Sequence, residues 1–223
     1  MEKKVACIAG TPVDTEMGAT LLSENGYEPF CYPTADNPVD QMKFQVSSSE
    51  SKYNALLNIL NKIKVLGINK VLVYCNSLSS AVDFNKLAKE TEIKIVTPLN
   101  VYEMDAKNYN SVAIIAANAV ATKKIEEIYL KANKDIQIVS IGMLPLVISI
   151  EKKISPEKII EIHDLKKMCE WFSNNGAKAL ILGCTHFPYI YEELKKVTDM
   201  NIVEPSRKMI ELLGKVYIIR RQV

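Results

Sequence analysis

The stretch that decides the fold lies at residues 179–188 and reads ALILGCTHFP. Four apolar residues run into Gly183 and Cys184, and a helical pattern follows from Tyr189 to Val197. This order predicts a buried strand that ends near Cys184 and is followed by a helix. Ligands of open α/β sheets bind at the carboxyl ends of the strands, so the polar residues at this end are candidate site residues.

A second stretch of the same kind lies at residues 71–77 and reads VLVYCNS. Here too an apolar run ends in a cysteine, Cys75, and small polar residues follow it. Each cysteine comes just before a predicted helix, whose N-terminal dipole favours a thiolate and is expected to lower the pKa of the thiol. Cys75 and Cys184 are therefore the leading candidates for chemistry.

The two cysteines belong to an internal repeat with an offset of about 108 residues. Residues 112–116 (VAIIA) echo residues 5–9 (VACIA), and Gly176 precedes Cys184 as Gly67 precedes Cys75. A repeat of this length favours duplication of one α/β unit over a solenoid. We therefore predict two similar doubly wound α/β domains related by pseudo-two-fold symmetry, with the active site in the cleft between them. The N-terminal domain is predicted to comprise residues 1–98 plus 206–223, and the second domain residues 99–205.

Within these domains the helical patterns predict single helices over residues 79–89 and 156–172. Residues 10–15 are predicted to form a polar loop before a helix over 17–23. The last apolar segment, residues 209–219, is predicted to form a helix and a final strand that pack back on the first half.

Composition argues for a soluble globular protein without a polyanionic partner. The chain has 223 residues, 48% of them hydrophobic and 24% charged, with a formal net charge of +2. This charge predicts neither nucleic acid nor a membrane surface as partner. No stretch reaches the roughly 20 apolar residues of a membrane span, and we expect a cytoplasmic protein. The five cysteines are expected to be reduced thiols, with Cys7 and Cys169 as core residues and Cys31 left open.

Two facing cysteines can invert a carbon centre, because one thiolate removes a proton while a thiol returns one on the opposite face. Hydroxyl, amide and backbone N–H donors for a substrate carboxylate follow both cysteines, on Asn76, Ser77 and Thr185. His186 either raises the thiolate fraction of Cys184 and relays a proton, or is a turn histidine bonded to backbone. His163 is expected to be solvated.

Residues 182–188 (LGCTHFP) and 74–80 (YCNSLSS) resemble the two signatures of the aspartate/glutamate racemase family. The resemblance implies two α/β domains around a cleft and racemisation of an amino acid with neither pyridoxal phosphate nor a metal. It implies Cys75 and Cys184 as the two acid/base residues, with Asn76, Ser77, Thr185 and His186 lining the substrate site. Glutamate is favoured over aspartate, and a homodimer is a further expectation because such racemases often pair.

The chain departs from glutamate racemases at the first loop, where Gly10-Thr11-Pro12 replaces the usual Asp-Ser-Gly. Gly10 and Thr11 are expected to bind substrate, and Asp14 is the candidate for the auxiliary acid. The usual Pro-Tyr-Gly is not evident in residues 32–46. The only arginines are Arg207, Arg220 and Arg221, so a side-chain carboxylate would be held by neutral donors or lysine.

Three alternatives remain open at this point. Related carbanion enzymes include hydantoin racemases, maleate isomerases and malonate decarboxylases, some of which use one essential cysteine. A small-molecule-binding paralogue without activity is the second. The third is a zinc site formed by Cys75, Cys184 and His186, although no Cys-x-x-Cys spacing supports it.

Overall fold

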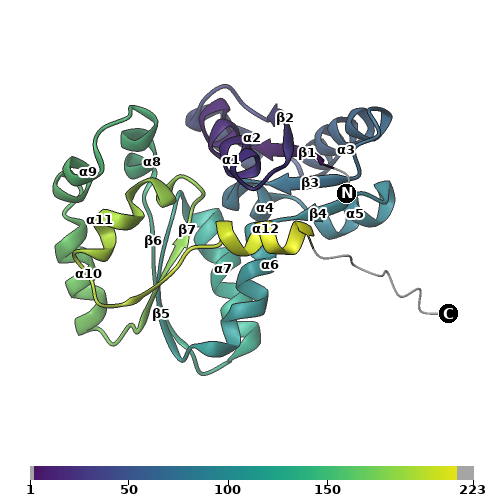
Figure 1. The fold of residues 1–223 in the computed structure, drawn as a ribbon. Helices are drawn as coiled ribbons and strands as arrows, with labels where there is room; N and C mark the ends of the chain where they lie inside the picture. Colours follow the sequence, from purple (N-terminus) through teal and green to yellow (C-terminus); the bar gives the residue numbers. More distant parts are fainter. Residues whose placement is uncertain (1–2, 215–223) are drawn as a thin grey trace.

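The computed structural model describes residues 3–214 and contains two four-stranded parallel sheets (Figure 1). The first sheet has the order β2-β1-β3-β4, and the second has the equivalent order β6-β5-β7-β8. The strands of the first sheet are β1 (Lys4–Ala9), β2 (Glu28–Pro33), β3 (Lys70–Val73) and β4 (Lys94–Val96). Those of the second are β5 (Ser111–Ala116), β6 (Gln137–Gly142), β7 (Ala179–Gly183) and β8 (Asn201–Val203). The prediction of two similar parallel α/β units is confirmed.

Helices connect the strands and cover the sheets (Figure 1). In the first half they are α1 (Pro12–Glu24), α2 (Pro38–Val46), α3 (Ser49–Val65), α4 (Asn76–Ala81), α5 (Phe84–Thr91) and α6 (Pro98–Asp105). In the second half they are the 3-10 helix η1 (Ala106–Asn108), α7 (Ala119–Ala132), α8 (Leu144–Glu151), α9 (Pro156–Ile162), α10 (Leu165–Asn174), the 3-10 helix η2 (Phe187–Ile190), α11 (Tyr191–Lys195) and α12 (Ser206–Gly214). None of the helices described is long and apolar enough to cross a bilayer.

The inner strands explain why the core forms where it does. In β1 and β7 almost every side chain is buried, because both faces of a parallel sheet are covered. These strands are accordingly near-continuous runs of Val, Ile, Leu and Ala rather than alternating patterns. Cys7 and Cys169 lie in this core, as predicted, whereas Cys31 is exposed.

Three predicted elements differ from the structure. Residues 12–15 are not loop, because α1 begins at Pro12, where Thr11 and Asp14 form a capping box. The predicted helix over 79–89 is two helices, separated at Val82 and Asp83, and Asp83 caps the second one. The helix over 156–172 is also two helices, because Asp164 adopts a positive φ of 48°.

Helix α12 returns from the second half to the first sheet. It packs against β3, β4 and α6, and Met209, Leu212 and Leu213 join the core around the first sheet (Figure 1). Lys94 donates from Nζ to the carbonyl oxygens of Leu212 and Leu213. Residues 215–223, which include the predicted final strand, lie outside the described residues. The division of the chain into 1–98 plus 206–223 and 99–205 stays a prediction.

Candidate active site

The two cysteines occupy equivalent places in the two sheets. Cys75 follows β3 and is the N-cap residue of α4, and Cys184 follows β7. β3 pairs with β1 in the first sheet and β7 pairs with β5 in the second, so β3 and β7 are the third strands of their sheets. The side chains are 3% and 5% exposed, so both thiols are buried in this structure.

His186 lies between the second cysteine and a carboxylate. Its Nδ1 is 3.6 Å from Sγ of Cys184, and its Nε2 is 3.0 Å from Oε1 of Glu151, which ends α8. Burial disfavours the imidazolium, but the contacts with Cys184 and Glu151 outweigh it and raise the pKa of His186 to about 10. The ring is therefore charged at neutral pH, and both nitrogens contact side chains rather than backbone.

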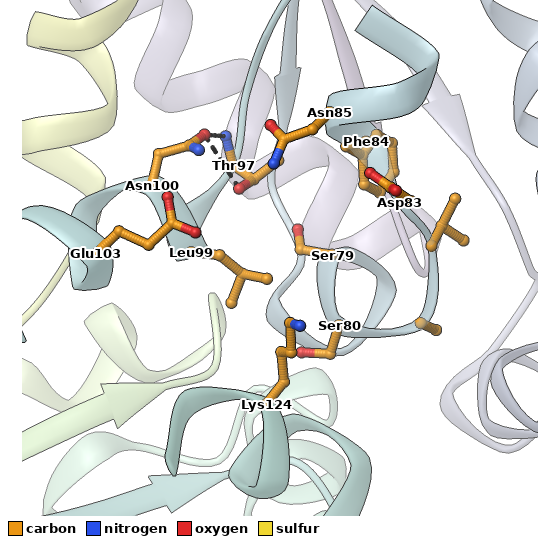
Figure 2. Close-up of a pocket in the computed structure, with 12 residues that line it drawn as sticks. Ser79, Ser80, Asp83, Phe84, Asn85, Thr97, Leu99, Asn100, Glu103 and Lys124 are labelled. Carbon is orange, nitrogen blue, oxygen red and sulfur yellow. Dashed lines mark hydrogen bonds between the residues drawn. The ribbon is translucent and has the colours of Figure 1, made fainter. Parts of the chain in front are cut away.

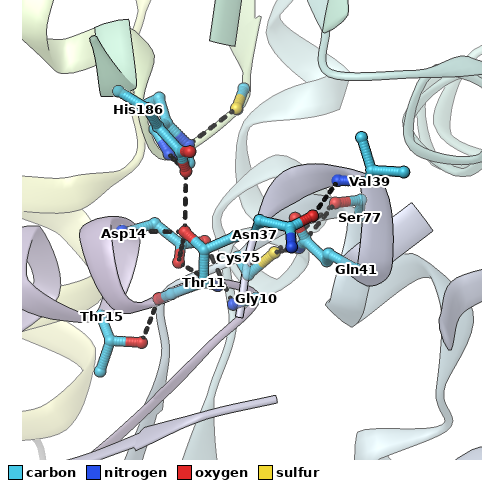
Figure 3. A network of polar contacts seen from close by, with 12 residues as sticks. Gly10, Thr11, Asp14, Thr15, Asn37, Val39, Gln41, Cys75, Ser77 and His186 are labelled. Carbon is cyan, nitrogen blue, oxygen red and sulfur yellow. Dashed lines mark hydrogen bonds and ion pairs between the residues drawn. The ribbon is translucent and has the colours of Figure 1, made fainter. Parts of the chain in front are cut away.

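The predicted Gly10–Asp14 segment reaches the same carboxylate from the first half. The Thr11 hydroxyl lies 2.8 Å from Oε1 of Glu151 and 3.0 Å from Oδ1 of Asp14. The Asp14 carboxylate accepts from the backbone N–H groups of Gly10 and Thr11 at 3.1 and 2.6 Å (Figure 3). Burial raises the pKa of Asp14, although His186 and the hydrogen bonds oppose this effect. The network thus crosses from one half of the molecule to the other.

Cys75 is contacted by a residue that sequence reasoning missed. Nε2 of Gln41, on α2, lies 2.9 Å from Sγ of Cys75 and 3.4 Å from Oγ of Ser77 (Figure 3). Gly10 leaves space for this amide, since a Cβ there would lie 1.7 Å from Nε2 of Gln41. Asn37 and Pro38 are an ordinary helix-start signal, so α2 itself could have been predicted. The place of Gln41 could not, because it depends on how α2 packs.

The prediction that a helix dipole lowers the pKa of the first cysteine is wrong. Burial raises the pKa of the Cys75 thiol well above its ordinary value, and the nearby Asp14 adds to the rise. The N–H of Leu78 lies 3.5 Å from Sγ and favours the thiolate, but α4 has only six residues. At Cys184 a turn and the 3-10 helix η2 follow instead of an α-helix.

The residues immediately after the two cysteines each carry a buried polar atom without a partner. Among the described residues these atoms are Nδ2 of Asn76 and Oγ1 of Thr185, with the hydroxyl of Tyr129 as a third. The other end of the Asn76 amide is held, because Oδ1 lies 2.9 Å from the hydroxyl of Tyr102. Buried polar groups normally have partners, so these atoms mark a place where a ligand can bind.

The surroundings of His163 and the alternative of a zinc site can also be compared with the structure. His163 is not solvated, since it is half-buried and its Nε2 lies 2.9 Å from Oγ of Ser149. Within residues 3–214 no group of three or more His, Cys, Asp or Glu side chains is placed to hold a metal ion, so the proposed zinc ligand set is not assembled.

A cavity of about 390 Å³ lies away from the cysteines, between α4, α5, α6 and α7 (Figure 2). Ser79 and Ser80 of α4 line it, together with Asp83, Thr97, Glu103 and Lys124. None of the predicted site residues lines this cavity. Both cysteines are buried and neither borders this cavity.

Comparisons with known proteins agree with this architecture. A glutamate racemase of Clostridium botulinum type E3 is 28% identical over 159 residues, which make up 67% of this chain and 57% of that relative's length. The glutamate racemase of Clostridium acetobutylicum is 25% identical over 177 residues, covering 77% of this chain and 68% of the relative. The crystal structure of Francisella tularensis glutamate racemase with D-glutamate matches with a TM-score of 0.73 at 18% identity, covering 96% of this chain and 80% of that one. No protein-family model matches the sequence.

Two equivalent parallel α/β units, each with a cysteine at the end of an inner strand, define a duplicated two-cysteine α/β protein. The sequence relatives are glutamate racemases, whereas the solved structures of similar fold also include an allantoin racemase of Klebsiella pneumoniae and an arylmalonate decarboxylase. The chain is thus similar to glutamate racemases over 67% and 77% of its length in the two sequence relatives, and it spans 57% of the length of the first of them.

Proposed function

We propose that this protein is a cofactor-independent amino-acid racemase that acts on glutamate in preference to aspartate. The observation that carries the proposal is the pair of cysteines in equivalent positions but different electrostatic surroundings. Cys184 contacts His186, whereas Cys75 lies among neutral donors and near Asp14. The glutamate preference is supported by the sequence relatives, which are glutamate racemases, and by the D-glutamate bound in the Francisella structure.

The different surroundings are the basis for assigning the two sulfur atoms different roles in the proposed reaction. The His186 imidazolium, with Nδ1 directed at Sγ, stabilises a thiolate at Cys184. Burial raises the pKa of Cys75, which therefore remains a thiol. A base and an acid are thus available at neutral pH, as inversion at a carbon centre requires.

In the proposed reaction the Cys184 thiolate removes the Cα proton of one enantiomer. The Cα–H bond breaks, an S–H bond forms at Cys184, and the electron pair stays on the substrate as a carbanion. Cys75 then donates its S–H proton to the opposite face and becomes a thiolate. The protein is left with the complementary protonation state, which is the one that the reverse reaction needs.

The substrate carboxylates are assigned to the unpartnered donors. The Asn76 amide and the Thr185 hydroxyl follow the two cysteines directly, and a bound carboxylate would satisfy both. Ser77, Gly10 and Thr11 are proposed to complete the binding site. Hydrogen bonds to the α-carboxylate also stabilise the carbanion, because negative charge moves toward that group during proton removal.

Three side chains are proposed to act around the cysteines. His186 is proposed to stabilise negative charge on the Cys184 sulfur during proton transfer. Glu151 orients the imidazole ring through Nε2 and favours its protonated form. Asp14, which lies close enough to Cys75 to influence its pKa, is the proposed auxiliary acid. The proposed compartment is the cytoplasm, where the five free thiols would stay reduced.

The test is exchange of the Cα proton in deuterated water with purified protein and no added cofactor. We expect deuterium at Cα and formation of the opposite enantiomer with L- and D-glutamate, measured by NMR and chiral chromatography. Cys75→Ser and Cys184→Ser should each lower turnover by about two to four orders of magnitude. Cys31→Ser, at an exposed cysteine, is the matched control and should retain turnover.

The outcomes separate this proposal from the alternatives. Exchange that survives one of the two serine changes would indicate a one-cysteine reaction. No exchange with glutamate, aspartate or the other common amino acids would overturn the proposal.

A further inference from the structure

Helix α2 is amphipathic in the reverse of the usual sense. Its buried residues are Gln41 and Gln45, one turn apart, while Val39, Met42 and Val46 are 47%, 38% and 71% exposed. A helix that belongs to the core normally buries its apolar face. Half-buried Phe44 packs α2 against the core of the first sheet, and the buried contacts of the helix beyond it are polar ones, which can exchange with water at small net cost.

Only a few hydrogen bonds link α2 to the rest of the molecule. Oε1 of Gln45 accepts from Nδ2 of Asn118 at 2.9 Å, which joins α2 to the start of α7 in the second half. The backbone carbonyl of Gln45 accepts from Nζ of Lys52 at 2.7 Å. Between them, these contacts hold α2 over the junction of the two halves.

Gln41 lies against the sulfur atom that the proposed reaction uses. A carbon that exchanges a proton with Cys75 must come within about 3–3.5 Å of the sulfur. The amide of Gln41 already lies 2.9 Å from that sulfur (Figure 3). Gln41 therefore covers the side of the sulfur that its amide contacts, and Cys75 is only 3% exposed while Gln41 is in place.

We propose that α2 is a lid and that Gln41 is the residue with which it covers Cys75. Substrate entry requires α2 to move, which breaks the Gln41–Cys75 contact and the Gln45–Asn118 hydrogen bond. The cover also keeps the first thiol from oxidation or alkylation while the site is empty. Asn118, in the other half of the molecule, controls access to Cys75 through Gln45 without touching the sulfur.

The test is the rate of alkylation of each cysteine by iodoacetamide, resolved by mass spectrometry of the full-length protein without substrate. Gln41→Ala should speed labelling of Cys75 by at least about fivefold, the factor expected when one ordinary hydrogen bond no longer holds the closed state. Asn118→Ser keeps an N-cap residue for α7 but removes the bond to Gln45, and should speed labelling of Cys75 with Gln41 intact. Cys184 should react at its wild-type rate in Gln41→Ala.

A matched variant separates covering from hydrogen bonding. Gln41→Met has similar length but no N–H donor, so it should speed labelling of Cys75 less than Gln41→Ala does, because its side chain still covers the sulfur. Cys31 provides a fast internal reference, and unlabelled Cys7 and Cys169 report that the core of each variant is intact. Alkylation does not require turnover, so this result stands apart from the racemase assay. Unchanged labelling of Cys75 in both Gln41→Ala and Asn118→Ser, with Cys31 labelled normally, would overturn the lid.

Discussion

Glu151 is the last residue of α8, and its Oε1 lies 3.0 Å from Nε2 of His186. This contact fixes the orientation of the imidazole ring. With Nε2 held by the carboxylate, Nδ1 is directed at Cys184. The same oxygen is 2.8 Å from the Thr11 hydroxyl, so the contact also joins the two halves. Several predictions about charge and position depend on this relationship and on its counterparts around Cys75.

Glu151→Gln should lower kcat while leaving KM for glutamate nearly unchanged. The amide keeps the shape of the side chain but no longer stabilises the imidazolium, so the pKa of His186 falls and the ring beside Cys184 loses positive charge. We expect a fall of about tenfold to a hundredfold, within the range for general acid–base partners. Steady-state kinetics measure it, and Glu161→Gln, an exposed change on α9, is the control. An unaltered kcat would contradict the role given to Glu151.

His186 should make stability depend on pH above neutrality. Its pKa in the folded protein is raised to about 10 from 6.5, so the stabilisation is fully present below about pH 6.5 and is lost as the pH rises through about 10. The difference in free energy of unfolding between wild type and His186→Asn should therefore shrink from pH 6 to pH 10. Urea unfolding at several pH values measures this difference. A difference that grows with pH would show that the ring is neutral in the folded state.

Thr185→Val should separate binding from stability. The buried Oγ1 has no partner, and replacing it with a methyl group removes a desolvation penalty of about 1–3 kcal/mol. We expect unchanged or higher stability and a KM for glutamate raised about tenfold, because a carboxylate contact is lost. In the control Thr91→Val, a hydroxyl that bonds the carbonyl of Leu87 is lost, and stability should fall. A large loss of stability in Thr185→Val would mean that its hydroxyl has a structural partner.

Tyr102→Phe should weaken the junction of the two halves. The Tyr102 hydroxyl lies 2.9 Å from Oδ1 of Asn76 and 2.8 Å from the carbonyl oxygen of Leu182, so its loss removes the single O–H donor that these two buried acceptors share. We expect a loss of about 1–3 kcal/mol and a lower kcat, because the Asn76 amide is no longer oriented. Tyr129→Phe is the matched control, since that buried hydroxyl has no partner. Equal stability changes in the two variants would contradict the proposed role of Tyr102.

Much of the fold could be predicted from local pattern. The apolar runs at residues 5–9, 71–74, 112–116 and 179–182 correspond to inner strands, because a strand buried on both faces needs consecutive apolar residues. The breaks at Asp83 and Asp164 were missed, because apolar spacing alone does not register a cap or a residue with positive φ.

The candidate site divides in the same way. Cys75, Cys184 and His186 stand out in the sequence because unusual residues follow apolar strands. Glu151 and Gln41 do not stand out, since each is an ordinary residue in an ordinary helical segment. Both gain significance from neighbours far along the chain, His186 and Cys75, which local sequence cannot indicate.

The duplicated α/β architecture and the two cysteines could be predicted from the sequence alone. Apolar runs and repeat spacing are visible along the chain whatever the packing of the segments. Tertiary structure alone decided the surroundings of those cysteines. It buried Cys75 under Gln41 and set an imidazolium beside Cys184, and so made two equivalent thiols electrostatically different. Charge state depends on solvent exclusion and on distances of a few ångströms between segments remote in the chain, and these arise only when the two halves pack together.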